Sequence, residues 1–368
     1  DPTESRGLGD VYKRQGVKHV RLGGMTDTYT YMADGVVELE YPVPNPEPIA
    51  SLLHGLREDE RLEILHTDNG NPSIIAENLE PSEAITKTLV ETLSDGAVLS
   101  FGLESADQAV HEANWLNCDP SQLKTAIRLI NKYGAERGNR GLPKLLPGLN
   151  FIAGLNGETS STYQQNLSLL RDIRSEDLLL RRINIRKVEG SGFQEIVERD
   201  FAEFKQSVRD EIDAPLLEDL FPKGEVLREI RWESHNGRTR LPVHLESPHI
   251  DETVRGKAGI TFGRQIGAYP ILVGAEYLIP LETTSDIIVT GHGARSITGV
   301  ECSLSMDTVS EKQLAAIPGI GNKSAWKLIG ERVKLKRKDP TKSFADTPTW
   351  FAAAGLTWHG ELGKYFSS

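Results

Sequence analysis

Polar residues and glycines suited to ligand binding follow successive short apolar runs of the chain, where strands would end. They are Gly23, Gly24 and Asp27 after the first run, His66 and Asp68 after the second, Glu104 and Ser105 after the third, and Gly154 after the fourth. Glycine lets the backbone approach a ligand, and the Glu104 carboxylate can accept hydrogen bonds from ribose hydroxyls or an amino group. The pattern predicts binding of a polar ligand the size of a cofactor.

Each of these residues also has a purely structural interpretation. A Gly-Gly pair after a strand commonly makes a tight turn, and a strand-end Glu commonly forms a salt bridge or caps a helix. Thr159 or Ser160 would serve as an N-cap. His66 and Asp68 either line the substrate side of a pocket or cap the end of a strand. The order of these features on successive strands favours the ligand.

The elements that position these residues alternate along the first two hundred residues. The apolar runs predict strands at Val17–Leu22, Leu62–His66, Ala97–Phe101, Leu149–Ala153 and Leu178–Val188. Helical patterns lie between them at Pro48–Arg57, Pro81–Leu93, Pro120–Tyr133 and Ser160–Ile173. This α/β alternation is typical of a parallel sheet with crossover helices, in a barrel or a doubly wound sheet. In both, ligands bind at the carboxyl ends of the strands.

Four segments carry a resemblance to a known family. They are Gly23-Gly24, Phe101–Asp107, Leu145–Thr159 and Leu178–Arg186. With these segments the chain resembles radical S-adenosylmethionine (SAM) enzymes, and more closely an archaeal-type subgroup that ends in a helix-hairpin-helix. The resemblance covers nearly everything after Gln15. It implies a partial radical SAM (β/α) barrel over residues 16–215, a TRAM-like or OB-like β-barrel module over 216–302, and an all-α helix-hairpin-helix over 303–368.

The resemblance also implies roles for individual residues toward SAM. The implied contacts are Gly23 and Gly24 with the methionyl amino group, Glu104 and Ser105 with the ribose and methionyl part, Asn150 and Gly154 with the adenosine, and Arg186 with the carboxylate. An Arg can clamp a carboxylate through two hydrogen bonds. Met25 stands where many members of the family have Glu, which makes Asp27 a substitute for that residue.

The resemblance implies a 4Fe-4S cluster and an electron donor such as ferredoxin or flavodoxin, but the cysteines do not match. The sequence has only Cys118 and Cys302, whereas such a cluster needs at least three thiolates from the protein. Cys118 precedes a helix start, so it is either activated by the helix dipole or a half-buried structural thiol. His235, His244 and His249 lack tight metal-ligand spacing, so no metal ligands are assigned.

The first fifteen residues, Asp1–Gln15, have no hydrophobic period and resemble translated sequencing-adapter read-through. We expect natural sequence to begin near Gly16, with the family's C-x3-C-x2-C loop lost upstream and this fragment inactive. A natural flexible arm is the alternative for this segment. A degenerate homologue that never held iron is the alternative for the whole chain.

Short strand-like runs separated by Gly or Pro predict a small β-barrel after Phe221. They are Val226–Trp232, Gly259–Phe262, Pro270–Val273 and Asp286–Thr290. Two stretches, 261–265 and 286–292, resemble the TRAM-like module of tRNA methylthiotransferases. In such a module Arg264, Tyr269, His292 and Arg295 would contact RNA through phosphate charge and base stacking. A structural lid on the first barrel is the alternative.

The segment Gln313–Trp326 has the sequence of a helix-hairpin-helix. Pro318-Gly319-Ile320-Gly321 ends one helix and opens the next, so the N–H groups of residues 320 to 323 would point at a phosphate. Basic residues follow, namely Lys323, Lys327, Lys334, Lys336, Arg337 and Lys338. This pattern predicts binding to a nucleic-acid backbone without sequence readout. Packing of the hairpin against another domain or subunit is the alternative.

Bulk properties limit the function. The 368-residue chain has a net charge of −11, which argues against a wholly basic DNA-binding surface, and it has no apolar run long enough for a membrane helix. Two distant cysteines fit a reducing cytoplasm. We expect a radical SAM enzyme that modifies an unknown substrate, with tRNA or another nucleic acid as a partner. The alternatives are a non-catalytic nucleic-acid-binding protein with a degenerate SAM-type barrel, and a corrinoid or methylthio-type reaction.

Overall fold

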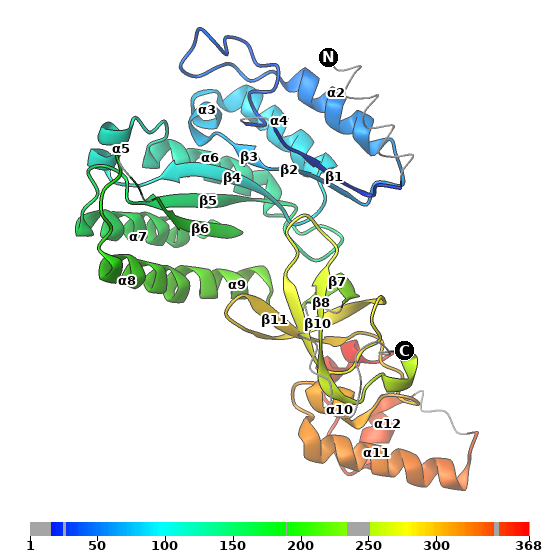
Figure 1. Ribbon diagram of the computed structural model, residues 1–368. Coiled ribbons are helices and arrows are strands. Elements are labelled where there is room, and N and C mark those ends of the chain that lie inside the picture. Colours follow the sequence, from blue (N-terminus) through cyan, green and yellow to red (C-terminus); the bar gives the residue numbers. More distant parts are fainter. Residues whose placement is uncertain are drawn as a thin grey trace. The chain divides into compact units, whose positions relative to one another are not determined.

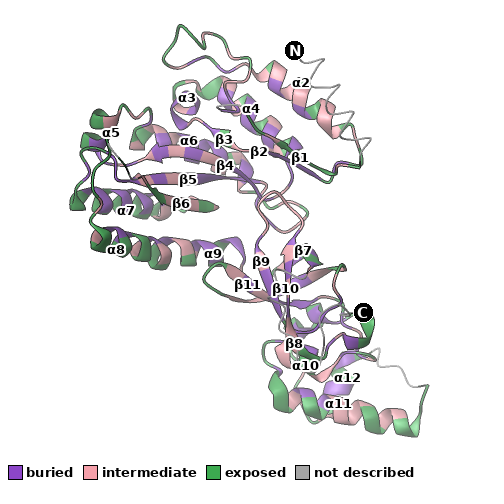
Figure 2. Ribbon diagram, viewed as in Figure 1, coloured by how far each residue is buried: buried purple, intermediate pink, exposed green. Residues whose placement is uncertain are grey.

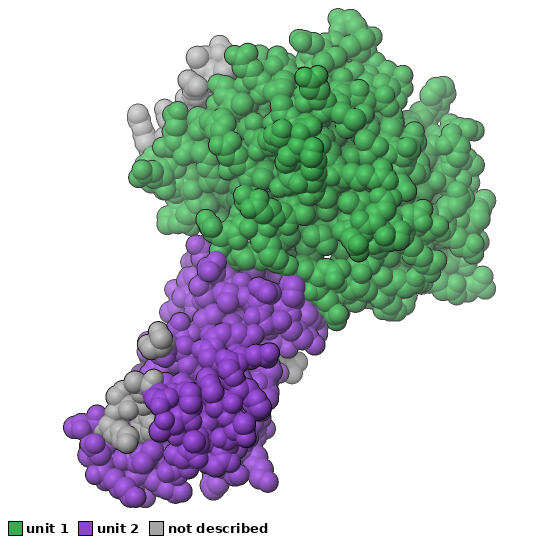
Figure 3. Space-filling model, turned by 180° about the vertical axis from the view of Figure 1, so that it is seen from behind, with its two compact units in different colours: residues 1–220, 267–269 green, residues 221–266, 270–368 purple. Residues whose placement is uncertain are grey.

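The computed structural model describes residues 16–24, 27–188, 190, 192–233, 251–341 and 346–367. Its contacts divide the chain into a first unit, Asp1–Leu220 with Gly267–Tyr269, and a second unit, Phe221–Ile266 with Pro270–Ser368 (Figure 3). The suspected foreign segment 1–15, Met25 and the three histidines at 235, 244 and 249 lie outside the described residues.

The first unit contains parallel strands in chain order (Figure 1). The strands are β1 (His19–Leu22), β2 (Ile64–Thr67), β3 (Asn69–Gly70), β4 (Ala97–Glu104), β5 (Leu145–Ala153) and β6 (Arg182–Lys187). One sheet pairs β1 with β2, and a second runs β3-β4-β5-β6, with every pair parallel. Right-handed crossovers between such strands place the connecting helices on one face. The predicted α/β alternation is therefore confirmed.

Helices lie between these strands and after β6. They are α2 (Pro46–Arg57), α3 (Pro72–Glu77), α4 (Leu79–Thr92), α5 (Gln108–Asn114), α6 (Pro120–Gly134), α7 (Ser160–Ser175), α8 (Glu198–Val208) and α9 (Ala214–Leu220), with a π-helical turn at Arg209–Asp213. Local sequence sets where they begin. The Asp119 side chain accepts from the backbone N–H groups of Ser121 and Gln122, and Pro120 occupies the first helical position.

The core of the first unit lies where helices pack on β4 and β5, which are mostly buried (Figure 2). Leu99, Phe101 and Leu149 are fully buried there. At Gly134, an added Cβ would lie 2.0 Å from the Leu145 carbonyl oxygen, so α6 approaches β5 as closely as glycine permits. This tight packing fixes α6 against the amino end of β5.

A closed five-stranded barrel forms the β part of the second unit. Its strands are β7 (Val226–Trp232), β8 (Ala258–Gln265), β9 (Leu272–Tyr277), β10 (Thr284–His292) and β11 (Ser296–Glu301). They close in the order β10-β11-β9-β8-β7, antiparallel except for the parallel β9–β11 pair. The predicted small barrel is confirmed. The fifth strand, β11, was not predicted.

Helices complete the second unit. They are α10 (Glu311–Ala316), α11 (Gly321–Lys338) and α12 (Thr347–Ala353), with 3-10 turns at Glu252–Val254 and Gly360–Tyr365. One buried cluster joins Ile288 and Val300 of the barrel to Leu314, Leu328 and Trp350 of the helices. None of the helices among the described residues is long and apolar enough to cross a membrane.

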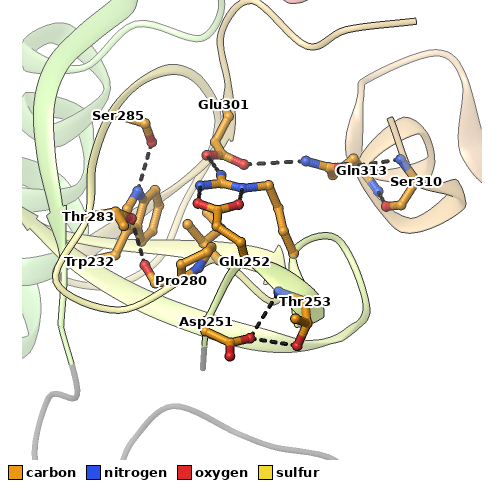
Figure 4. Close-up of polar contacts among 12 residues, drawn as sticks. Trp232, Asp251, Glu252, Thr253, Pro280, Thr283, Ser285, Glu301, Ser310 and Gln313 are labelled. Carbon is orange, nitrogen blue, oxygen red and sulfur yellow. Dashed lines mark hydrogen bonds and ion pairs between the residues drawn. The ribbon is translucent and has the colours of Figure 1, made fainter. Parts of the chain in front are cut away.

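A buried polar network links the barrel to α10 (Figure 4). Glu301 ends β11 and lies within 2.5 Å of Arg255 Nη1, while its other oxygen accepts from Gln313 Nε2 at 3.4 Å. Gln313 and Ser310 form a capping box, and Ser310 Oγ donates to the Gly256 carbonyl at 2.7 Å. Barrel residues therefore hold the first turn of α10.

Candidate functional site

A cavity of about 360 Å³ lies at the carboxyl ends of β3 and β4 in the first unit. This volume lies within the range of small-molecule sites. Its lining includes Asp27, Asn69, Gly102, Glu104, Trp115 and Asn150. No Lys, Arg or His lines it among the residues that the structure describes. The site is thus rich in acidic and amide groups, at the edge of the sheet where the sequence predicts ligand binding.

One carboxylate oxygen of Asp27 accepts backbone hydrogen bonds, whereas the other has no partner among the described residues. Its Oδ1 accepts from the backbone N–H of Asn71 at 2.8 Å and of Tyr29 at 3.2 Å. Its Oδ2 is buried and has no hydrogen-bond partner among the described residues. Burial raises the pKa of Asp27 to about 6. An oxygen in this state is suited to a donor supplied by a ligand.

Glu104 ends β4 in an unusual backbone conformation. Its φ of 67° lies in the left-handed region, and the pairing of β4 with β5 shifts register between Gly102 and Glu104. Gly102 leaves room for the carboxylate, since an added Cβ would lie 2.8 Å from Glu104 Oε1. The bulge therefore directs the carboxylate back over its own strand and into the cavity lining.

The Glu104 carboxylate resembles that of Asp27 in its surroundings. Its Oε2 is buried and has no hydrogen-bond partner in the part of the chain that the structure describes. Burial raises the pKa of Glu104 to about 7, and the charge of Arg186 opposes that rise. A ligand that brings a positive charge would favour the ionised form of both groups. The cavity can therefore select a cation through hydrogen bonds and charge.

Two further predicted residues lie near these carboxylates. Asn150 on β5 lines the cavity, and its Oδ1 accepts from Asn184 Nδ2 of β6 at 2.9 Å. Arg186 is exposed on β6, and its charge acts on Glu104. The structure thus brings together Asp27, Glu104 and Asn150, with Arg186 at their edge.

The other predicted SAM contacts do not line this cavity. Ser105 is buried, and its Oγ accepts from the Asp107 backbone N–H at 3.1 Å. The Gly154 N–H donates to Glu158 Oε2 at 2.9 Å, and an added Cβ there would lie 2.6 Å from the Val188 carbonyl. The cavity lining also leaves out Gly23 and Gly24, although Gly24 has the left-handed φ of 81° that favours glycine.

His66 and Asp68 also lie away from the cavity lining. Asp68 pairs with Arg21 Nε at 2.5 Å and with His66 Nε2 at 3.1 Å. Burial lowers the pKa of His66. Its ring meets that of Tyr269 edge-on at 4.8 Å between centroids. This arrangement fits the structural alternative, a strand end held by the Arg21–Asp68 ion pair and by the contact of the neutral His66 ring with Tyr269.

Cys118 lines the cavity as a buried thiol. Burial raises its pKa to about 12, so the thiol stays protonated at neutral pH and is a poor nucleophile.

Sequence reasoning missed the contribution of Trp115. It follows α5 in the left-handed conformation, with φ of 55°, and is 89% exposed at the cavity. Helices commonly end on Gly or Asn in this conformation, so the sequence carries no clear signal for Trp there. Asn69 and Asn71 lie in the predicted strand-end segment, but their part in this cavity depends on tertiary packing.

The segment Pro318–Gly321 lies between α10 and α11, where the sequence predicts the turn of a hairpin. Gly319 and Gly321 have φ of 88° and 61°, and no atom lies within 4 Å of a Cβ added to either. Glycine is therefore required by conformation there, and the backbone is open to a large ligand. Ile320 N–H donates to the Ile317 carbonyl at 3.1 Å, so of the four N–H groups predicted to point at a phosphate, those of residues 321 to 323 in the first turn of α11 remain. Lys323 and Lys327 are exposed on the following helix.

The predicted RNA contacts of the β module lie on different elements. Arg264 is half-buried on β8, and Arg295 is exposed after β10. His292 Nε2 lies 2.6 Å from the Phe221 carbonyl oxygen, which ties this ring to the chain entering the barrel. Tyr269 belongs to the first unit, where Arg182 lies over its ring.

An iron-sulfur cluster does not fit the residues of this chain. The two cysteines supply fewer than the three thiolates that a cluster requires. Among the described residues, no three His, Cys, Asp or Glu side chains are grouped so that they could hold a metal ion.

No family model matches the chain. Two uncharacterized archaeal proteins are similar to it. One from Archaeoglobus fulgidus is 37% identical over 335 residues, which cover 88% of this chain and 57% of that protein. One from Methanocaldococcus jannaschii is 34% identical over 300 residues, which cover 78% of this chain and 52% of that protein. The chain thus spans a little over half the length of these curated relatives.

One solved structure that is similar to part of this chain is that of coproporphyrinogen III oxidase (HemN) from Escherichia coli, a radical SAM enzyme. It matches at 10% identity and a TM-score of 0.32, over 72% of this chain and 57% of that chain.

Proposed function

We propose that the first unit binds SAM in its acidic cavity and forms the cofactor-binding part of a radical SAM enzyme. The observation that carries this proposal is the pair of unpartnered, buried oxygens, Asp27 Oδ2 and Glu104 Oε2, on one cavity without a basic lining residue among those described. SAM carries a sulfonium and an ammonium group, so it supplies both the charge and the donors that these oxygens lack. Asn150 adds amide groups for the adenosine, and Arg186 adds charge for the carboxylate.

The proposal for this chain is confined to binding and positioning. Radical SAM enzymes use an iron-sulfur cluster to cleave SAM, and the two cysteines here do not provide one. The carboxylates instead hold and orient the cofactor in a partly enclosed site. Ser105, Gly23, Gly24 and Gly154 then act by shaping the strand ends rather than by touching the ligand.

We further propose that the second unit holds a nucleic-acid substrate, such as a tRNA. Supporting features are the open glycine hairpin, the exposed lysines of α11 and the closed five-stranded barrel, an architecture shared with OB-type nucleic-acid-binding modules. Arg264, Arg295, Gly319, Gly321, Lys323 and Lys327 are the proposed contacts. Phosphate contacts of this kind position a strand without reading its sequence.

Calorimetric titration of the purified chain tests the cavity directly. SAM should bind more tightly than S-adenosylhomocysteine, which lacks the sulfonium charge. Glu104→Gln should weaken SAM binding about tenfold or more, since a hydrogen bond to a charged group contributes about 1.5–3 kcal/mol. Glu176→Gln, at an exposed ion pair with Arg128, is the matched control and should bind as the wild type does. Equal affinity for the two ligands, or an unaffected Glu104 variant, would refute SAM as the ligand.

The shortage of cysteines favours one second candidate, a non-catalytic nucleic-acid-binding protein with a degenerate SAM-type barrel. Under this hypothesis the cavity has no cofactor role. The wild-type chain would then fail to bind SAM, and Glu104→Gln would leave both nucleic-acid affinity and the response to SAM unchanged.

A further inference from the structure

The outer face of α11 combines positive charge with one large aromatic ring. We call this the basic face, which consists of Lys323, Trp326, Lys327, Lys334, Arg337 and Lys338, all exposed. Ala325 and Leu328 are fully buried on the opposite side of the helix. The 3.6-residue period of a helix places the members of the basic face on one stripe.

Trp326 lies within this stripe and is open to a ligand. Its side chain is 67% exposed, and it stands between Lys323 and Lys327 in the first turns of the helix. One turn further on is Gly330, where no atom lies within 4 Å of an added Cβ. The ring therefore has free space beside it on the same face, directly after the glycine hairpin.

The charge of α11 contrasts with that of the chain as a whole. The helix contains seven Lys or Arg residues and a single Glu, in a chain of net charge −11. Lys334 pairs with that Glu331 at 3.2 Å, whereas Lys323 and Lys327 have no ion-pair partner among the described residues. From Lys323 to Arg337 the stripe extends about 21 Å at the helical rise of about 1.5 Å per residue. It can contact several phosphates of one strand.

These properties identify a polyanion as the occupant. A second copy of the same face would be repelled by like charge. A membrane would need a broader apolar face than Trp326 and its one exposed apolar neighbour, Val333, provide. Duplexes bury the faces of their bases by stacking, whereas single strands offer them to aromatic side chains.

We propose that the basic face of α11 binds single-stranded nucleic acid, with Trp326 stacked on an unpaired base and Lys323 and Lys327 on the flanking phosphates. This inference rests on the proposed nucleic-acid binding of the second unit and adds the strand state that it recognises. The hairpin holds the sugar-phosphate backbone of the nucleic acid, and the Trp326 ring distinguishes an unpaired strand from a duplex.

Fluorescence anisotropy with labelled RNA and DNA oligonucleotides, single-stranded and as duplexes of the same sequence, tests the proposal on the full chain. Single strands should bind more tightly than duplexes. Trp326→Ala should weaken single-strand binding about tenfold or more, as expected for loss of one stacked base, and should change duplex binding little. Trp326→Phe should retain most of the affinity. Phe193→Ala removes an exposed aromatic ring of the first unit and should match the wild type.

Circular dichroism of each variant establishes that it is folded before binding is compared. Duplex binding as tight as single-strand binding would overturn the proposal. So would an unaffected Trp326→Ala variant beside a weakened Lys323→Ala/Lys327→Ala variant, although that result would leave the proposed phosphate contacts intact. A wild-type chain that binds no oligonucleotide would instead refute the nucleic-acid part of the proposed function. Binding to anionic lipid vesicles in place of oligonucleotides would overturn the strand-specific inference.

Discussion

The acidic cavity of the first unit and the basic face of the second unit use charge in opposite ways. The cavity carries buried carboxylates with pKa values raised to about 6 and about 7, so its charge changes near neutral pH. The basic face carries exposed Lys and Arg, which stay charged throughout that range but are screened by salt. The comparison teaches that burial makes a site sensitive to protons, whereas exposure makes it sensitive to ionic strength.

The largest effect should come from the buried polar network that links the barrel to α10. Glu301→Ala removes one of the two carboxylates that pair with Arg255, which keeps Glu252, and it removes the acceptor of Gln313. Loss of these hydrogen bonds to a charged group should lower the free energy of unfolding of the second unit by about 2 kcal/mol. Chemical denaturation measures this change. SAM binding by the first unit should be unaffected, and a parallel loss of SAM affinity would contradict the separation of the two regions.

The next largest effect concerns the shape of the cavity. Gly102→Ala should push the Glu104 carboxylate aside, because the added Cβ would lie 2.8 Å from its Oε1. We expect SAM affinity to fall about tenfold, in the range of a lost charge-assisted hydrogen bond, with little change in melting temperature. Calorimetry and thermal melting measure the two quantities. An unchanged affinity would show that Glu104 does not reach the ligand from its observed position.

A dependence on pH should then separate the two regions. Burial raises the pKa of both Asp27 and Glu104 in the folded state, so each protonated carboxyl contributes stability to the ligand-free first unit at acidic pH, and this contribution is lost as pH rises through about 6 and about 7. SAM binding needs the ionised forms of these carboxylates and should therefore strengthen over the same pH range. The affinity should rise roughly tenfold for each unit by which bound SAM lowers the pKa of either carboxylate. Titrations at acidic and alkaline pH, with Asp27→Asn as comparison, measure this. Nucleic-acid binding should stay constant.

The smallest effect concerns the basic face of α11 and the salt dependence of its binding to nucleic acid. Lys323→Ala/Lys327→Ala should weaken nucleic-acid binding several-fold and reduce the slope of log affinity against log salt by about 0.7 to 0.9 for each phosphate that the variant no longer neutralises. Anisotropy over a salt series gives the slope. Lys205→Ala, on α8 of the first unit, is the matched control and should preserve it. A slope unchanged in the double variant would exclude these lysines as phosphate contacts.

Local sequence was sufficient to predict most of the elements. Asp119-Pro120 signals a helix start, and Val226–Trp232 has the composition of a strand, so both elements appear where expected. The strand β11 was missed because Ser296, Thr298 and Gly299 weaken the apolar signal, while its pairing with β9 and β10 depends on residues distant in sequence.

The cavity was predicted less completely than the fold. Asp27, Glu104 and Asn150 were among the candidates, because polar residues at strand ends share one edge of a parallel sheet. The register shift at Gly102 changes which side chains face that edge, which is why Glu104 lines the cavity and Ser105 does not. The unpartnered state of Asp27 Oδ2 depends on packing from several elements, which sequence alone does not specify.

The left-handed backbone of Glu104 implies a conflict between folding stability and ligand binding. This conformation costs an ordinary residue about 1–2 kcal/mol but costs glycine almost nothing. A Glu104→Gly chain is therefore expected to be more stable and to have lost its ligand. Stability selection alone would remove the carboxylate from this position. A screen for thermostable variants should recover glycine there, and a screen for ligand binding should reject it.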